Sequence, residues 1–559
     1  MLNSYQNKLI EAWLNSENVS DDLKKQIESM SDEQKEQAFK EDQLKFGTAG
    51  YRAIMGPGNH YLNEITYKQL AYGYAEYLKH YGMNNKDKKI VVVSDNRLNY
   101  VNHIKGIINV LKSFDYEVIV AENFQPFPTP ILSYVIRETN AIGAINITAS
   151  HNPKEYNGIK FYNGTGSQLL PNEDLKLIQY IPDSFTFLDK TFDDYTQDVQ
   201  IIDQSIIDKY FSDIISCLKL TKANDFKEPI LFSSMHGTSS NYMTKFLKSL
   251  DYNIIDYSLH NFINSEFINA KNINPESFEA FKDLIEFAEK LNIKYIIATD
   301  PDADRLGFCY KRQNEWILLD GNRAGIIQTN YLMTHKEFHD KKPAIISTYV
   351  SNNFIDLIAQ KYNANVYRTA TGFKWIANAI NNLDDNEEFV IGFEEAIGAL
   401  DCDINREKDS FQVAGLLLEI LKSYQSLNYD FTDILEKEIY AKYKYWYGIT
   451  ISKIIKSYNW KEVSESYINL LSNYSHKNIV SRNIEKIQFN EQANCLEFIL
   501  ENNSWIKFRI SGTEPKFKIY FNLYYEGISK NKLASEIDQE LKQEIDDILD
   551  FIELYLQMK

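Results

Sequence analysis

The sequence predicts an α/β protein with three consecutive α/β domains and mostly parallel, mixed sheets, followed by a C-terminal α+β domain. Short apolar, β-branched runs alternate with longer amphipathic stretches over most of the chain, as expected when helices connect parallel strands. After about residue 440, closely spaced apolar runs indicate antiparallel strands closed by a helix. A length of 559 residues allows roughly three or four domains, each with its own core.

The individual elements follow from these patterns. Residues 1–43 have helical apolar spacing and predict helices packed on the body of the protein. The predicted strands of the α/β part are residues 90–93, 118–121, 141–147, 230–232, 294–298, 344–347 and 389–391, and the helical patterns between them include residues 67–81, 278–291 and 353–362. In the C-terminal part, strands are predicted at residues 484–489, 495–500, 505–510 and 517–523, with a helix from residue 532 onward.

These elements group into four expected domains. They are residues 1–200 (N-terminal helices and a first α/β domain), 201–315 (second α/β domain), 316–440 (third α/β domain) and 441–559 (α+β domain).

The overall composition is that of an acidic globular protein. Hydrophobic residues make up 44% and charged residues 25% of the chain, and the net charge is −18. Because no long Lys or Arg run is present, we expect neither nucleic acid nor a membrane surface as a partner. No signal peptide and no apolar run of about 18–20 residues is visible, so we expect a cytoplasmic protein.

The four cysteines, Cys217, Cys309, Cys402 and Cys495, are widely spaced and form no CxxC pair. This spacing argues against a disulfide framework or a zinc ribbon and is typical of a reducing compartment.

The first polar cluster is TASHNP, residues 148–153, directly after a predicted strand. The Asn-Pro pair forces a turn, so Ser150 is expected to be exposed at the carboxyl end of the strand, with His151 beside it and Lys160 ten residues later. Such a serine can form a covalent intermediate when neighbouring groups accept its proton and stabilise the charge that develops. A turn serine bonded to its own main chain is the alternative.

The second cluster is DPDADR, residues 300–305, also directly after a predicted strand. In an extended loop, alternate residues point the same way, so Asp300, Asp302 and Asp304 are expected to converge on one hard cation. Three carboxylates favour Mg²⁺, which keeps positions for water and a phosphate oxygen, over Ca²⁺. A solvated acidic surface cluster is the alternative.

The third and fourth clusters carry groups that could bind a sugar and a phosphate, with two solvated glutamates and a plain turn as the respective alternatives. Residues 392–398, GFEEAIG, place two carboxylates at a strand end, where they can accept hydrogen bonds from sugar hydroxyls. Residues 509–516, RISGTEPK, combine a guanidinium, two hydroxyls, a glycine and a lysine, which are the donors that bind a phosphate monoester. No Walker A pattern occurs in the chain.

Together these motifs resemble the α-D-phosphohexomutase family of phosphoglucomutases and phosphomannomutases. TASHNP, DPDADR, GFEEAIG and RISGTEPK occur in the family's order, and the resemblance extends over roughly residues 44–525. It implies domains around a central cleft, with a C-terminal domain like the TATA-binding protein. The family's usual GEESG sugar loop has a serine where this chain has Ala396, and its Lys-Asp-Gly is here Lys408-Asp409-Ser410.

The resemblance also implies roles for individual residues. Catalytic positions fall on Ser150 as the phosphoserine and on His151, Lys160 and Arg52 around it; magnesium ligands fall on Asp300, Asp302, Asp304 and an oxygen of phosphorylated Ser150. Substrate-binding positions fall on Arg305, Thr371, Gly372, Glu394, Glu395 and Lys408, and phosphate-binding positions on Arg509, Ser511, Gly512, Thr513 and Lys516.

The implied activity is an intramolecular phosphotransferase that exchanges phosphate between carbons 1 and 6 of a sugar. Mg²⁺ would be the metal, and a sugar 1,6-bisphosphate the intermediate and activator. The GFEEAIG form resembles the bacterial phosphoglucomutase and phosphopentomutase branch and favours glucose, with mannose and pentose phosphates as alternatives. Lys160 and His151 are both candidates for the general acid and base. We expect a monomer or a homodimer.

Two other classes of function are compatible with parts of the pattern. In a haloacid-dehalogenase-like phosphatase, Asp302 and Asp304 would supply an aspartyl nucleophile, but the usual DxDx[TV] pattern meets Leu306 here and leaves Ser150 without a task. A phosphosugar-binding protein without catalytic activity is the other possibility, although the intact serine and aspartates argue against it.

Overall fold

The computed structural model describes residues 2–41, 50–82, 88–218, 226–443, 445–457, 459–511, 515–525 and 534–557. The chain forms two compact units, which are described separately. The first contains Met1–Lys219, Phe226–Leu318 and Cys402–Gly415, and the second contains Leu220–Asp225, Leu319–Asp401 and Leu416–Lys559. Within the described residues, we find no helix that combines the length and apolar character required to cross a bilayer.

The first sheet of the first unit is mixed. Its strands are β1 (Tyr51–Ile54), β2 (Lys89–Ser94), β3 (Glu117–Val120), β4 (Gly143–Ile147), β5 (Tyr156–Asn163) and β6 (Gln200–Ile201), in the order β1-β5-β4-β2-β3-β6. Strands β4, β2, β3 and β6 are parallel, whereas β5 runs antiparallel to both β4 and β1. Its β-branched central strand β2 is buried along nearly its whole length, as is typical of a sheet covered on both faces.

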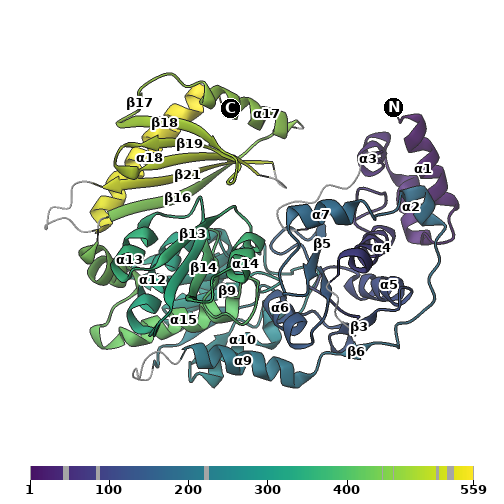
Figure 1. The fold of residues 1–559 in the computed structure, drawn as a ribbon, viewed down its shortest axis with the longest axis horizontal. Helices are drawn as coiled ribbons and strands as arrows, with labels where there is room; N and C mark the ends of the chain where they lie inside the picture. Colours follow the sequence, from purple (N-terminus) through teal and green to yellow (C-terminus); the bar gives the residue numbers. More distant parts are fainter. Residues whose placement is uncertain are drawn as a thin grey trace. The chain divides into compact units, whose positions relative to one another are not determined.

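Helices cover this sheet, and three further helices precede it at the N-terminus. The long helices α4 (Glu64–Tyr81) and α5 (Tyr100–Lys112) lie side by side (Figure 1). The side chain of Asn63 caps α4 by accepting from the N–H groups of Ile65 and Thr66. The other segments are α1 (Ser4–Asn15), α2 (Asp21–Ser29), α3 (Asp32–Ala38), η1 (Glu122–Phe124), α6 (Thr129–Glu138), α7 (Pro171–Ile178) and α8 (Ser184–Leu188).

The second sheet of the first unit is also mixed. Its strands are β7 (Ile230–Ser233), β8 (Ile254–Asp256), β9 (Tyr295–Thr299), β10 (Leu306–Arg312) and β11 (Glu315–Leu318), in the order β11-β10-β9-β7-β8. Strands β9, β7 and β8 are parallel, and β10 is antiparallel to both of its neighbours. The accompanying helices are α9 (Gln204–Leu218), η2 (Thr238–Asn241), α10 (Met243–Ser249), η3 (Phe278–Phe281) and α11 (Lys282–Leu291).

The second unit contains the third sheet. Its strands are β12 (Lys342–Thr348), β13 (Asn365–Thr369), β14 (Glu387–Glu394) and β15 (Gly398–Leu400), in the order β13-β12-β14-β15. The first three strands of this order are parallel, and β15 is antiparallel to β14. The helical segments are α12 (Gly321–His335), α13 (Phe354–Tyr362), α14 (Phe373–Asn381), η4 (Gln425–Leu427), α16 (Phe431–Asp433), η5 (Ile434–Ile439) and η6 (Tyr440–Lys442). Helix α15 (Ser410–Ser423) begins in the first unit, which contains its residues up to Gly415, and ends in the second.

The C-terminal sheet of the second unit is antiparallel throughout. Its strands are β16 (Tyr445–Ile454), β17 (Asn478–Ile479), β18 (Arg482–Asn490), β19 (Cys495–Leu500), β20 (Trp505–Ile510) and β21 (Lys516–Tyr525), in the order β16-β21-β20-β19-β18-β17. Helices α17 (Trp460–Ser472) and α18 (Ala534–Leu556) pack on this sheet (Figure 1), and η7 (Glu501–Asn503) connects β19 to β20.

The predicted fold class is confirmed. All the strands predicted from apolar runs are present, and those at residues 495–500 and 505–510 have the predicted bounds. The three α/β sheets are mixed, and the C-terminal sheet is antiparallel as expected. The proposed domain boundaries after residues 200, 315 and 440 stay a prediction.

One connection recurs in the three mixed sheets. The parallel strands β4, β9 and β14 each lead through a short loop into the neighbouring antiparallel strand, which is β5, β10 or β15, respectively. Three of the four polar clusters found in the sequence lie on these connections. The loop after β4 is called the serine loop (residues 148–155), and the loop after β9 the acidic loop (residues 300–305).

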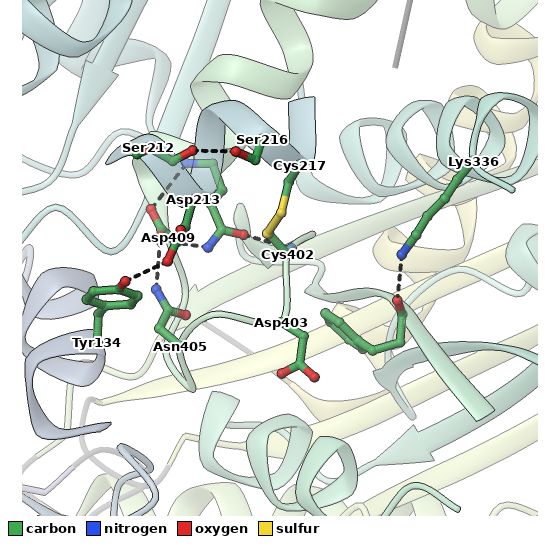
Figure 2. The surroundings of a disulfide bond; sticks show 12 residues. Tyr134, Ser212, Asp213, Ser216, Cys217, Lys336, Cys402, Asp403, Asn405 and Asp409 are labelled. Carbon is green, nitrogen blue, oxygen red and sulfur yellow. Dashed lines mark hydrogen bonds between the residues drawn. A yellow bond between two sulfur atoms is a disulfide. The ribbon is translucent and has the colours of Figure 1, made fainter. Parts of the chain in front are cut away.

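A disulfide joins Cys217 on α9 to Cys402, with the Cα atoms 6.2 Å apart (Figure 2). The cysteine spacing had argued against disulfides, and it is a poor guide here because 185 residues separate the two partners in the chain. Asp409, seven residues after Cys402, accepts hydrogen bonds from Tyr210 Oη at 2.6 Å and Asn405 Nδ2 at 2.7 Å. The contact with Tyr210 also connects α9 to the residue that precedes α15.

His103 on α5 links the stability of the first unit to pH. It is 7% exposed, its Nδ1 has no hydrogen-bond partner in the described part of the chain, and its ring lies 4.5 Å from that of Tyr67. Burial lowers the pKa of His103 to about 4. Between about pH 6.5 and 4 the native state therefore binds fewer protons than the unfolded chain, and folding stability falls as the pH decreases.

We expect His103 to cost about 3 kcal/mol of stability as the pH falls from about 6.5 to below 4. The replacement His103→Phe removes this contribution, because phenylalanine does not bind a proton. Thermal unfolding of both proteins at pH 7 and pH 4.5 measures the difference, and other acid-sensitive groups affect both proteins alike. An equal loss of Tm on acidification in the two proteins would contradict the assignment.

Candidate functional site

Ser150 lies in the serine loop, at the carboxyl end of β4. Its main chain has a left-handed conformation with φ +52°, which is uncommon for a residue with a Cβ atom. The N–H of Ser150 donates to Thr148 Oγ1 at 2.8 Å and helps to hold the turn. Ser150 is only 1% exposed, so the expectation of an exposed serine is wrong; its hydroxyl group contacts Asp300 in the loop after β9.

The acidic loop brings three carboxylates together by means of a tight turn. The N–H of Ala303 donates to the carbonyl oxygen of Asp300 at 3.0 Å, and Ala303 has φ +60°. The N–H of Asp304 donates to Asp300 Oδ1 at 3.1 Å. One oxygen each of Asp300, Asp302 and Asp304 lies within 4.8 Å of the others. The carboxylates converge as predicted, but the turn, and not an extended loop, brings them together.

The serine loop and the acidic loop are in contact, although 150 residues separate the two in sequence. Ser150 Oγ donates a hydrogen bond to Asp300 Oδ2 at 2.6 Å. Asp302 Oδ2 accepts from Thr129 Oγ1 at 3.2 Å and lies 3.1 Å from Thr148 Oγ1. The carboxyl ends of β4 and β9, from two different sheets of the first unit, thus meet at one place.

Three cations lie against the carboxylates. Lys160 Nζ on β5 is 3.0 Å from Asp302 Oδ2 and 3.5 Å from Asp304 Oδ2. Lys408 Nζ is 3.3 Å from Asp304 Oδ2, so this residue, which sequence reasoning grouped with the sugar cluster, contacts the acidic loop. Arg305 Nε lies 3.8 Å from Asp304 Oδ1. The charge of the acidic loop is therefore partly balanced by the protein itself.

Two further predicted residues lie next to the serine. His151 Nδ1 is 3.1 Å from Ser150 Oγ. Desolvation of the imidazole and the positive charges of Arg305 and Arg52 lower the pKa of His151 well below its ordinary value, so the imidazole is neutral at pH 7. Arg52 Nη1 donates to Asn152 Oδ1 in the serine loop at 2.7 Å.

The carboxylates differ in their affinity for a proton. Burial and the charges of Asp302 and Asp304 raise the pKa of Asp300 well above its ordinary value. Burial also acts on Asp302, but the ammonium of Lys160 outweighs it and lowers the pKa of Asp302. The pKa of Asp304 is likewise lowered, because Lys408 and Lys160 outweigh burial and the charge of Asp302. In return, Asp302 and Asp304 raise the pKa of Lys160 despite its burial, which keeps it an ammonium.

The acidic loop fits a hard divalent cation. The Oδ1 atoms of Asp302 and Asp304 are buried and have no hydrogen-bond partner among the described residues. Buried carboxylate oxygens without a donor are costly unless a cation or a proton neutralises them. All-oxygen ligands with space left for other groups are typical of Mg²⁺ sites in proteins.

The sugar cluster lies in the second unit, at the end of β14. Gly372 has φ +110°, a conformation that favours glycine, and its N–H donates to Glu394 Oε1 at 2.8 Å. Thr371 precedes it in the same turn. Glu395 Oε2 accepts from Thr348 Oγ1 at 3.1 Å, and burial together with the charge of Glu394 raises the pKa of Glu395. The predicted residues Thr371, Gly372, Glu394 and Glu395 therefore form one group.

The phosphate cluster also lies in the second unit, between β20 and β21. Arg509 is the penultimate residue of β20, and the N–H of Ser511 donates to the carbonyl oxygen of Lys516 at 3.0 Å. This bond brings the two ends of the connection together. Gly512 and Thr513 lie outside the described residues.

Comparison with known families identifies the type of protein. The models described as Phosphoglucomutase/phosphomannomutase, alpha/beta/alpha domains I, II and III match residues 43–185, 208–313 and 320–439. The chain belongs to the α-D-phosphohexomutase family. As a phosphohexomutase it is an intramolecular phosphotransferase of the isomerase class.

Individual relatives of this phosphohexomutase carry two different names. Phosphomannomutase from Mycoplasmoides pirum is 42% identical over 539 residues, which cover 96% of this chain and 99% of that protein. Phosphoglucomutase from Staphylococcus saprophyticus is 30% identical over 545 residues, with 93% and 97% covered. The solved open form of parafusin, a phosphoglucomutase from Paramecium, has the same fold, with a TM-score of 0.64, 18% identity, and 92% and 95% coverage.

Sequence reasoning missed three charged residues of the candidate site. Arg97 is fully buried and binds the main chain of the serine loop, and it forms an ion pair with Asp95 at 3.4 Å. Glu407 is buried and accepts from Tyr162 Oη at 3.0 Å and from Gln168 Nε2 at 2.5 Å. Asp95 and Arg97 directly follow β2, so the rule that ligands gather at the carboxyl ends of strands could have found them.

Proposed function

We propose that this phosphohexomutase interconverts the 1-phosphate and the 6-phosphate of a hexose through a phosphorylated Ser150. The main support is the 2.6 Å contact between Ser150 Oγ and Asp300 Oδ2, which sets a serine hydroxyl against three clustered carboxylates. A serine beside a metal site and several cations can carry a phosphoryl group, because the transfer requires positioning and charge neutralisation more than new covalent chemistry.

In the proposed reaction, the bond between Ser150 Oγ and phosphorus breaks as a free sugar hydroxyl bonds to that phosphorus. The sugar then carries phosphate at carbons 1 and 6. After the bisphosphate has turned over, Ser150 Oγ takes the other phosphoryl group, and the isomeric monophosphate leaves. A sugar 1,6-bisphosphate is thus the intermediate, and it can also phosphorylate an enzyme that has lost its phosphate.

Asp300, Asp302 and Asp304, together with a phosphoserine oxygen, would hold Mg²⁺, which would neutralise negative charge on the phosphoryl group. The ammonium of Lys160 would add positive charge from the side of β5. Arg305 and Arg52 would bring guanidinium groups to the same centre.

For the proton of the sugar hydroxyl, we propose His151 as the acceptor. Its neutral imidazole lies 3.1 Å from Ser150 Oγ, so it is next to the oxygen that exchanges the phosphoryl group. Lys160 is already an ammonium held by two carboxylates and is a poorer base. It is better suited to stabilise charge or to donate a proton.

We propose sugar-binding and phosphate-binding roles for the remaining predicted residues. Glu394 and Glu395 present carboxylates that can accept hydrogen bonds from sugar hydroxyls, and Gly372 fixes Glu394. The phosphate that does not react would be bound by the cluster between β20 and β21. The proposed contacts are Thr371, Gly372, Glu394, Glu395 and Lys408 for the sugar, and Arg509, Ser511, Gly512, Thr513 and Lys516 for the phosphate.

For the sugar itself, we propose glucose, on the basis of the GFEEAIG sequence of the sugar loop and of the Staphylococcus relative named phosphoglucomutase. Mannose is the second candidate, because the Mycoplasmoides relative is named phosphomannomutase. We further propose a cytoplasmic monomer or homodimer.

The substrate is tested by coupled assays that follow conversion of the 1-phosphates of glucose, mannose, glucosamine and ribose in the presence of Mg²⁺. We expect kcat/KM for glucose 1-phosphate to exceed that for mannose 1-phosphate by at least about tenfold, the range that one altered polar contact provides. An equal or higher kcat/KM for mannose 1-phosphate would identify mannose, and not glucose, as the preferred sugar. Phosphate release without isomerisation would instead indicate a phosphatase.

A further inference from the structure

We propose that Arg97 is a positioning residue, which holds Ser150 in its reactive orientation by binding the main chain of the serine loop. Arg97 Nη2 donates to the carbonyl oxygens of Ser150 and Asn152, each at 2.7 Å. Its Nη1 donates to the carbonyl oxygens of Pro153 at 2.6 Å and Tyr156 at 3.0 Å. One guanidinium group thus fixes three points of the serine loop and the first residue of β5. The inference rests on the proposed role of Ser150 as the phosphoryl carrier.

Arg97 is held by groups that leave it little freedom to move. It is 0% exposed, and its main-chain N–H donates to Asp95 Oδ1 at 3.0 Å. Its Nε lies 3.4 Å from Asp95 Oδ2. The guanidinium carbon is 5.1 Å from the centre of the Phe267 ring, within the range of a cation–π contact. The carboxylate of Asp95 and the ring of Phe267 therefore together fix the orientation of the guanidinium group.

A second path connects the same pair to the serine. Asp95 Oδ2 accepts from Thr148 Oγ1 at 2.7 Å, and Thr148 Oγ1 in turn accepts from the N–H of Ser150 at 2.8 Å. Arg97 therefore holds Ser150 through its carbonyl oxygen, and Asp95 holds it through its N–H by way of Thr148. Both polar groups of the Ser150 main chain are engaged by this network.

Such support is needed because the main chain of Ser150 has φ +52°, which costs free energy for a non-glycine residue and persists only where the surroundings impose it. The same conformation directs Ser150 Oγ to Asp300 Oδ2. A lysine could not replace Arg97, because an ammonium is a point charge with three donors and lacks the planar fork that reaches several acceptors.

The test is the steady-state kinetics of Arg97→Lys and Arg97→Met, with Lys154→Met as the matched control. Lys154 is a cation of the serine loop itself, but it is half exposed and pairs with Glu266 at the surface. We expect kcat to fall about 10²-fold in both Arg97 variants, as for a small misplacement of a reacting group. We expect KM to change less than about threefold, because no donor of Arg97 is directed to substrate. The control should keep both constants.

Further measurements separate positioning from a loss of structure. Thermal unfolding reports how much of each variant is folded at the assay temperature, and intact-protein mass reports the rate at which phosphate is lost from Ser150. A loosened serine loop should speed this loss. Phe267→Leu leaves Arg97 in place but removes its aromatic neighbour, and we expect a smaller decrease in kcat at unchanged KM.

Wild-type kcat in a folded Arg97→Met protein would overturn the inference, and so would a decrease that only follows the folded fraction. If the Arg97 variants do not fold, wild-type kcat and phosphate loss in Phe267→Leu would overturn it. The proposed function fails in a different way, through the absence of mutase activity in the wild type or through full activity in Ser150→Ala.

Discussion

Replacing Ser150 with alanine is expected to lower kcat for hexose phosphate isomerisation by about 10⁴-fold or more. The hydroxyl group of Ser150 is the atom that accepts and returns the phosphoryl group in the proposed reaction, and alanine offers no acceptor. The substitution removes only the hydroxyl group, with its contacts to Asp300 and His151. Because the side chain is small, we expect the fold to change little. The coupled assay with purified protein, in which intact mass reports the phosphorylated fraction, measures the effect.

The appropriate control is Ser234→Ala. Ser234 is also a buried serine that follows a strand of the first unit, and its hydroxyl donates to the carbonyl oxygen of His260 at 2.9 Å. The substitution Ser234→Ala should lower the stability of the protein somewhat and leave kcat within about threefold of wild type. A sugar 1,6-bisphosphate should restore activity to dephosphorylated wild type but not to Ser150→Ala. If Ser150→Ala kept more than a tenth of the activity, Ser150 would not be the carrier.

The position of the serine and of the aspartates could be predicted because each motif directly follows a run of β-branched and apolar residues. Those runs are buried parallel strands, which sequence patterns identify well. The strands that return from the motifs were not predicted. Gly158 in β5 and Gly307 in β10 weaken the strand signal, yet each is required by close packing. A Cβ atom would lie 2.3 Å from the Thr148 carbonyl oxygen at Gly158, and 2.4 Å from that of Pro275 at Gly307.

The meeting of Ser150 with the acidic loop was expected from the family resemblance, but other contacts between distant segments could not be predicted from the sequence patterns. The pairing of Cys217 with Cys402 and the binding of the serine loop by Arg97 depend on which elements become neighbours in the fold. A lone arginine after a strand looks like a surface residue, because most arginines are exposed. Its burial becomes clear only when four carbonyl oxygens surround it.

The recurring connection explains why chemistry gathers where it does. A parallel strand ends with its carbonyl groups and a loop at one edge of the sheet, and the antiparallel return strand keeps that loop short and anchored at both ends. In the first unit, β5 also supplies Lys160, which contacts Asp302 from the second sheet. The same element thus ends the serine loop and contributes a cation to the acidic loop.

Removing one carboxylate from the acidic loop is expected to abolish Mg²⁺ binding and to lower kcat by about 10³-fold. Asp302→Asn is the most informative change. Asp302 Oδ2 accepts hydrogen bonds from Thr129 and Lys160 and lies 3.1 Å from Thr148 Oγ1, whereas its Oδ1 has no hydrogen-bond partner among the described residues. An asparagine can keep its oxygen at the position of Oδ2 and place its amide nitrogen at the position of Oδ1.

The substitution therefore preserves the contacts of the fold and removes a metal ligand. A cation that binds only the native state raises Tm as its concentration increases, so titration of Mg²⁺ during thermal unfolding measures binding without reference to activity. We expect a rise in Tm for wild type and little or none for Asp302→Asn. Activity lost on treatment with a chelator should return with Mg²⁺ and less with Ca²⁺, whose larger radius and higher coordination number suit this site poorly.

Asp213→Asn is the matched control, since Asp213 accepts a hydrogen bond from Tyr134 Oη at 2.6 Å and takes no part in the acidic loop. It should respond to Mg²⁺ as wild type does. If Asp302→Asn showed the wild-type rise in Tm, the acidic loop would not be the metal site. If it lost the rise in Tm but kept its kcat, Mg²⁺ would bind there without serving phosphoryl transfer. Loss of both is the outcome that connects the buried, donor-free oxygen of Asp302 to the reaction at Ser150.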